Sequence, residues 1–187
     1  MATSIEIFNA AATILGQSGI SSFDTEDVLS RQAKAIYNLT RDEVLRAHPW
    51  NCAVKRISLA ASADTPLFDY TYQYTLPSDW LKTLQVGEYG VESDYRAEGR
   101  SLLLNESGPL YFRYIYKNYD ETTWDSLLTM TMVYSLCEKF SYLITGSPNI
   151  LELVSAKLKE CRREARAVDG QDEPPESFGD YPLRQVR

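Results

Sequence analysis

An alternating run of nine residues, 68–76, constrains the fold more than any other part of the sequence. Because successive side chains of a β-strand point to opposite faces, a period of two predicts a half-buried strand. A proline directly follows the run and cannot donate a ladder hydrogen bond, so the strand should end there. We expect the even-numbered face to lie in the core, since Phe68, Tyr70, Tyr72, Tyr74 and Leu76 are aromatic or apolar, whereas Asp69, Thr71, Gln73 and Thr75 are small or polar.

The period of two continues through residues 52–119, which we expect to form a small, mostly antiparallel sheet. Glu98 and Gly99 are typical of a tight turn and predict a hairpin within residues 95–104. The segment also holds nine of the 13 tyrosines, a residue that suits both sheets and surfaces buried on assembly. Further strands are predicted at residues 54–59, 81–86 and 110–117.

Helical periodicity precedes this β-rich segment. The first helix is predicted to begin after Thr3, whose side chain would form a capping box with that of Glu6, and to end at Gly16. The second is predicted to begin near Asp24, with acidic residues in its first turn, where the helix dipole favours anions. It should stop at His48, because the following proline disfavours helical geometry there.

Two further helices follow the β-rich segment. One is predicted to run from Thr122 or Thr123 to Ile144 and to end at Gly146; the next opens at Pro148 and shows a narrow apolar seam. The earlier of these two helices has two neighbouring apolar stripes, which suggests that its own subunit covers one side and a neighbour the other. The stripes are Leu128, Met132, Leu136 and Leu143, beside Val133, Cys137, Phe140 and Ile144.

These patterns predict an α+β fold. A helical bundle core of about four helices would be formed by residues 1–51 and 120–170, with an inserted β-rich domain at residues 52–119. Prolines and acidic residues dominate residues 171–187, so we expect a flexible, extended C-terminal tail. Apolar and basic residues within the tail suggest a segment that becomes ordered on a partner: Phe178, Tyr181, Leu183, Arg184 and Arg187.

The outer face of the last predicted helix carries five basic residues within ten positions. A solvated helix face, with cations favoured near the C-terminal end by the helix dipole, is the simpler interpretation. The alternatives are contacts with the acidic surface of a neighbouring subunit or with passing DNA. The residues are Lys157, Lys159, Arg162, Arg163 and Arg166.

The sequence contains no recognisable catalytic, phosphate-binding or metal-binding motif, and its three cysteines are widely spaced. We expect the single histidine, His48, to pack on Trp50 at a helix end rather than act as a base or a metal ligand. We therefore predict no enzymatic activity, no cofactor and no metal. The net charge of −7 argues against a stand-alone duplex-DNA binder. No apolar run approaches the roughly 20 residues of a membrane span, and no signal peptide is evident, so we expect a soluble protein that is cytoplasmic at synthesis.

The order of two segments along the chain says more about the class of protein than the composition does. The segment LRAHPWNCA (residues 45–53) ends a helix, and YTYQYTLPSDWL (residues 70–81) follows within a β-rich insert flanked by helices. This order resembles the head-to-tail connector family of short-tailed bacteriophages, also called the tail tubular protein A or adaptor family. The resemblance covers approximately residues 5–168.

The resemblance implies a structural virion protein at the head–tail junction. Copies of such a protein form a ring, a dodecamer in that family, beneath the portal and receive the tail nozzle on the other side. The ring helps to close and connect the DNA channel, and viral DNA passes through without sequence-specific binding. The family's C-terminal tail grips the portal, which would correspond to residues 171–187. Two other classes stay open: a phage-encoded cell-wall hydrolase and a monomeric host-binding module.

Overall fold

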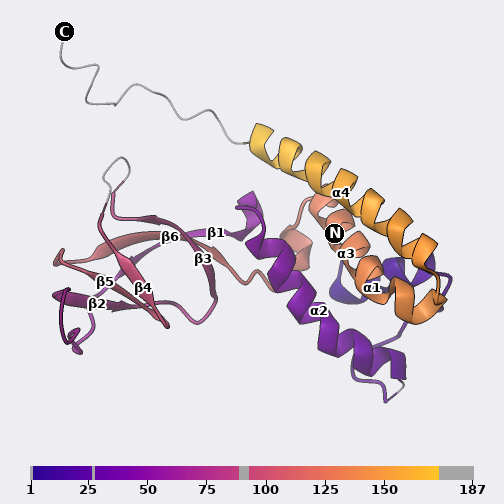
Figure 1. Ribbon diagram of the computed structural model, residues 1–187, viewed down its shortest axis with the longest axis horizontal. Coiled ribbons are helices and arrows are strands. Elements are labelled where there is room, and N and C mark those ends of the chain that lie inside the picture. The colour runs from indigo at the N-terminus through magenta and orange to yellow at the C-terminus, as the bar shows by residue number, and fades with distance from the viewer. Residues whose placement is uncertain (1, 27, 89–92, 173–187) are drawn as a thin grey trace, which may run out of the picture. The chain divides into compact units, whose positions relative to one another are not determined.

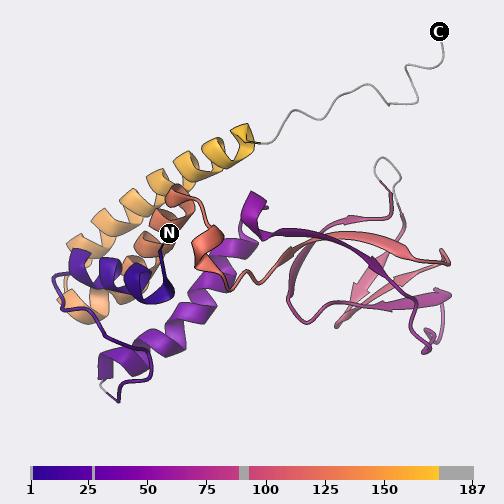
Figure 2. The same cartoon turned by 180° about the vertical axis from the view of Figure 1, so that it is seen from behind.

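The computed structural model describes residues 2–26, 28–88 and 93–172. The fold is α+β, with four α-helices and two small antiparallel sheets, as the sequence predicts. The chain divides into two compact units, which we call the helical unit (Met1–Cys52 and Asn118–Asp172) and the β unit (Ala53–Lys117). Figures 1 and 2 show the helices of the first unit and the strands of the second.

The helical unit contains α1 (Ser4–Ile14), α2 (Val28–Arg46), α3 (Ser126–Thr145) and α4 (Pro148–Gln171), and a short 3₁₀ turn at Glu121–Thr123 precedes α3. Helix α3 contacts each of the other three helices. The helical unit itself therefore covers nearly all of the two apolar stripes predicted on α3, and no neighbour is required for this. Leu143, which is 68% exposed, is the clear exception.

The predicted start of α1 is confirmed, because the side chain of Thr3 accepts from the backbone N–H of Glu6 and the Glu6 carboxylate accepts from that of Thr3. The predicted start of α2 is wrong, since the helix begins at Val28. Before it, Asp24 donates its backbone N–H to the Ser22 hydroxyl, in the kind of local turn that competes with helix formation. The Asp24 carboxylate binds the Lys34 ammonium instead of capping the helix.

Helix α3 also begins later than predicted. The side chain of Asp120 accepts from the backbone N–H of Thr122 and holds the chain in the 3₁₀ turn. Trp124 is extended, and Asp125 then caps α3 by accepting from the N–H of Leu127. The predicted C-terminus is confirmed at Gly146, whose φ of +62° is the left-handed conformation that glycine adopts at helix ends.

The β unit contains two three-stranded sheets rather than one. The first has the order β1-β6-β3, with β1 Val54–Leu59, β6 Leu110–Tyr116 and β3 Trp80–Val86. The second has the order β2-β5-β4, with β2 Tyr72–Thr75, β5 Ser101–Leu104 and β4 Arg96–Glu98. All pairings are antiparallel, and β4 and β5 form the hairpin predicted around Glu98 and Gly99. One core is built from both sheets and includes Tyr74, Leu76, Leu102, Leu104, Phe112 and Tyr114.

The alternating run at residues 68–76 forms a shorter strand than predicted. Tyr74 and Leu76 are buried and Tyr72 is half-buried, but Phe68 is 75% exposed, so its assignment to the core is wrong. The backbone N–H of Tyr70 donates to the carbonyl of Phe68, and Asp69 between them has a φ of +68°. This tight turn interrupts the extended conformation although the alternation of side chains continues through it.

Candidate assembly surfaces

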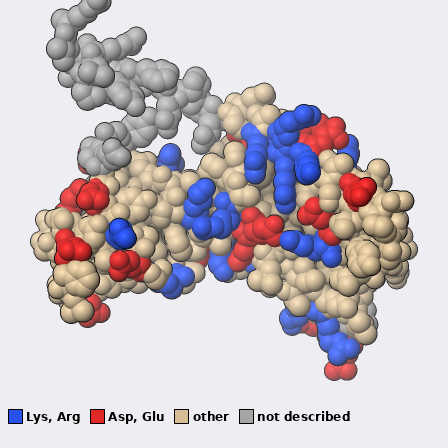
Figure 3. Space-filling view, in the orientation of Figure 1, with Lys and Arg blue, Asp and Glu red and all other residues tan. Residues whose placement is uncertain are grey.

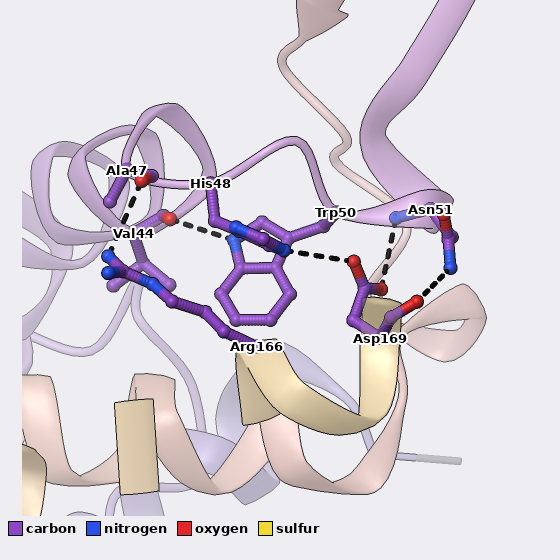
Figure 4. A network of polar contacts seen from close by, with 7 residues as sticks. All are labelled: Val44, Ala47, His48, Trp50, Asn51, Arg166 and Asp169. Atoms are coloured by element: carbon purple, nitrogen blue, oxygen red, sulfur yellow. Dashed lines mark hydrogen bonds and ion pairs between the residues drawn. The ribbon is translucent and has the colours of Figure 1, made fainter. Parts of the chain in front are cut away.

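A buried tryptophan fixes the chain where it leaves α2. Trp50 is 2% exposed, and its indole N–H donates to the carbonyl of Val44 at 3.0 Å. The ring of His48 meets the Trp50 ring edge-on, with 4.6 Å between ring centroids (Figure 4). The predicted packing of His48 on Trp50 is therefore confirmed.

Asp169, in the last turns of α4, fastens this segment. Its carboxylate lies 3.2 Å from Nε2 of His48 and accepts the backbone N–H of Asn51 at 3.1 Å. The side-chain amide of Asn51 donates to the Asp169 carbonyl at 2.8 Å, and Arg166 donates to the carbonyl of Ala47 (Figure 4). The backbone and the side chain of Asn51 are thus both hydrogen-bonded to Asp169 of α4.

Sequence reasoning missed Asp169, because 121 positions separate it from His48. One local signal was available. The helix dipole disfavours a carboxylate near the C-terminal end of a helix, so an aspartate at this position of α4 indicates that some other group compensates for the cost.

A second set of hydrogen bonds joins the two segments through which the chain leaves the helical unit for the β unit and returns from it. Asn118 is 3% exposed, and its side-chain amide donates to the carbonyl of Cys52 at 2.8 Å and to the Thr123 hydroxyl at 2.9 Å. Its side-chain oxygen accepts the backbone N–H of Asp120. Burial, with the charge of Asp169 adding to it, raises the pKa of the Cys52 thiol to about 11, so this thiol is protonated at neutral pH.

The basic residues predicted on α4 separate into two groups. At about 3.6 residues per turn, Lys159, Arg162, Arg163 and Arg166 lie on one side of the helix and form what we call the α4 stripe. Lys157 lies on the opposite side and pairs with Glu160 at 2.6 Å, so it does not belong to the stripe. Lysine and arginine side chains gather over α4 in Figure 3.

Two members of the α4 stripe also support the helical unit itself. Arg162 donates to the Ser135 hydroxyl at 3.4 Å, and Arg166 donates to the Ala47 carbonyl at 3.4 Å. Lys159 and Arg163 are exposed, so they are the members best placed to meet a partner. The predicted portal-binding residues Phe178, Tyr181, Leu183, Arg184 and Arg187 lie outside the described residues.

Among the described residues, no three histidine, cysteine, aspartate or glutamate side chains gather in a way that could hold a metal ion. No helix in the described part of the chain is long and apolar enough to cross a membrane. No known protein-family model matches the sequence, and no curated protein matches it either.

Proposed function

We propose that this chain is the subunit of a head-to-tail adaptor, a structural virion protein that forms a ring between the portal and the tail nozzle of a short-tailed bacteriophage. The observation that carries the proposal is the insertion of the β unit into the helical unit at a single place. Asn118 ties the two crossing points together through the Cys52 carbonyl. A module inserted in this way leaves the helical packing intact, so each unit can serve a different neighbour in the assembly.

The residues that carry the family resemblance also support the proposal, because they lie at structurally demanding positions. In the first segment, Trp50 is buried and His48 is bound to α4. In the second, the carboxylate of Asp79 accepts from the Lys55 ammonium at 2.7 Å and from the Tyr114 hydroxyl at 2.9 Å. Its backbone carbonyl accepts the N–H of Lys117. Residues in such positions maintain the fold, so a resemblance at these residues favours a shared architecture.

In this proposal the portal contact is made by residues 171–187, with Phe178, Tyr181 and Leu183 as apolar anchors and Arg184 and Arg187 paired with portal acids. The exposed members of the α4 stripe face an acidic surface of the neighbouring subunit or the DNA in the channel. The net charge of −7 makes free copies repel one another. We therefore expect free subunits to be monomeric and to form the ring chiefly on the portal, which supplies binding energy to offset that repulsion.

The proposal is tested by mixing the purified protein with the portal of the phage that encodes it. Native mass spectrometry should show monomers alone and a complete ring on the portal. A truncated chain that ends at Gly170 should retain its melting temperature and lose stable attachment. The matched control is Asp172→Asn, which removes one acid of the tail and keeps every predicted anchor. Unchanged portal affinity of the truncated chain, or a portal-independent complex of a few subunits that cannot bind the portal, would contradict the proposal.

A further inference from the structure

The outer face of the first sheet is basic in an otherwise acidic protein. Strands β1, β3 and β6 together contain four basic residues and no acidic one. One of the four, Lys55, is bound to Asp79. The other three share a face of the sheet, because Arg56 pairs in register with Arg113, and Lys82 with Ile115 two positions along β6.

Arg56 and Arg113 are directly opposite each other on neighbouring strands, a placement that costs free energy because like charges repel. On its other side Arg113 faces Gln85, which carries no charge to offset it. Within the described part of the chain, Nε of Arg113 is buried and has no hydrogen-bond partner. Glu88 lines the same groove and supplies one negative charge near the two guanidinium groups, and a carboxylate from a ligand would neutralise the positive charge that remains.

The two arginines line an open groove that is partly apolar. Its volume is about 650 Å³, and its lining includes Glu88 and Tyr111, the latter of which is 53% exposed. Pockets of roughly 300–1,000 Å³ hold small molecules, so this groove has room for one or two large apolar side chains. The groove therefore suits a ligand that presents apolar side chains next to a negative charge.

The same chain presents such a ligand in the loop that precedes β2. Residues 60–71 contain two aspartates and no basic residue. Leu67 and Phe68 are adjacent in this loop and are 97% and 75% exposed, the highest values among the large apolar residues of the described chain. Asp69 follows them directly, and its positive φ helps to form the turn at the loop tip.

We propose that the loop of one copy inserts Leu67 and Phe68 into the Arg56–Arg113 groove of a second copy, with the Asp69 carboxylate pairing with the arginines. The loop lies below β2 in Figure 1, and the residues that line the pocket at the loop have no member in common with those that line the groove. The loop and its groove are thus different surfaces of one copy. Such a contact is heterologous, and it closes into a ring when the rotation between copies divides a full turn. The inference names the contact between copies in the proposed adaptor and so rests on that function.

Disulfide trapping between two variants tests the contact directly. Phe68→Cys in one copy and Ser58→Cys, in the groove wall of a differently tagged copy, are mixed with the portal, on which copies are expected to assemble, and oxidised. The product that contains one copy of each variant should form in several-fold higher yield than with the control pair Leu39→Cys and Ser58→Cys. Leu39 is 72% exposed and lies in α2, which makes it a matched exposed leucine. Oxidised wild-type protein gives the background from the native cysteines.

Charge variants added to the same pair test the ionic part. Arg56→Gln and Asp69→Asn should each lower the yield several-fold, and asparagine tolerates the positive φ of position 69. Arg31→Gln, which changes an exposed arginine of α2, should leave the yield unchanged. A yield no higher than that of the control pair, or one insensitive to Arg56→Gln and Asp69→Asn, overturns the proposal.

Two further outcomes distinguish this contact from DNA binding in the groove and from the adaptor function as a whole. If a DNA oligonucleotide binds, if Arg56→Gln abolishes that binding, and if trapping stays at the control level, the groove holds phosphates and the proposal is overturned. A complete ring on the portal with trapping at the control level would rule out this contact and still support the adaptor function. Efficient trapping with no ring on the portal would support the contact between copies and contradict the adaptor function.

Discussion

The carboxylate of Asp169 lies 3.2 Å from Nε2 of His48 and joins the end of α4 to the chain that leaves α2. The same carboxylate accepts the backbone N–H of Asn51, one residue before the cysteine whose carbonyl binds Asn118. The segment from His48 to Cys52 is therefore held at both of its ends. These polar contacts fix the chain at the point where it leaves the helical unit for the β unit.

Replacing Asp169 with alanine should destabilise the helical unit. The change removes the acceptor of the partly buried His48 ring and of the exposed backbone N–H of Asn51, and we expect a loss of about 0.5–1.5 kcal/mol in the free energy of unfolding. Urea denaturation followed by circular dichroism measures this loss. Asp172→Ala is the matched control, because Asp172 is exposed and lies just past the end of α4. Equal stability of the two variants would show that the Asp169 contacts contribute nothing.

How far the sequence predicts this structure depends on how many positions separate the interacting residues along the chain. The α1 capping box, the Gly146 terminus and the β4–β5 hairpin depend on neighbours within a few positions, and these predictions are confirmed. The start of α2 was misplaced, because the acidic residues before Val28 occur in a turn as readily as in a first helical turn.

The candidate sites could not be predicted from local sequence patterns alone. The bond between His48 and Asp169 joins residues 121 positions apart, and the pairing of Arg56 with Arg113 depends on the register between β1 and β6. Alternation shows that two residues face the same way within one strand, but it does not show which residue of another strand lies opposite. The exposed loop at Phe68 was not predicted for a related reason: its side chains continue the alternation of the strand that follows.

Neutralising Asp169 should also make the thiol of Cys52 more reactive. Burial is the larger cause of its raised pKa and the negative charge of Asp169 is the next, so Asp169→Asn should lower the pKa from about 11. The rate of alkylation at Cys52, measured by peptide mass spectrometry from pH 7 to pH 10, should then rise at lower pH than in the wild type. Asp172→Asn should leave the profile unchanged. Identical profiles for Asp169→Asn and the wild type would rule out an effect of this charge.

Asp79 should make the β unit sensitive to acid. Burial pushes its pKa upward, but the bonds from Lys55 and Tyr114 outweigh burial and hold the pKa below the usual value. Because the folded pKa is lowered, this stabilisation is complete above the unfolded pKa of about 4 and is lost as the pH falls through the folded value. Asp79→Asn should therefore be less stable than the wild type at pH 7, and the difference should shrink below about pH 4. Asp64→Asn, in an exposed loop, is the control, and a difference independent of pH would contradict the assignment.

Three aromatic substitutions should separate core from surface. Trp50 is 2% exposed and hydrogen-bonded, so Trp50→Ala should cost about 3–5 kcal/mol by leaving a cavity. Tyr72→Ala should cost less because the side chain is half-buried. Phe68→Ala should change the free energy of unfolding by no more than about 0.5 kcal/mol, because this ring is mostly exposed and its proposed role is a contact with a second copy. Chemical denaturation of the three variants measures the order. If Phe68→Ala were as destabilising as Trp50→Ala, the loop would support its own subunit and the proposed contact would lose its exposed apolar side chain.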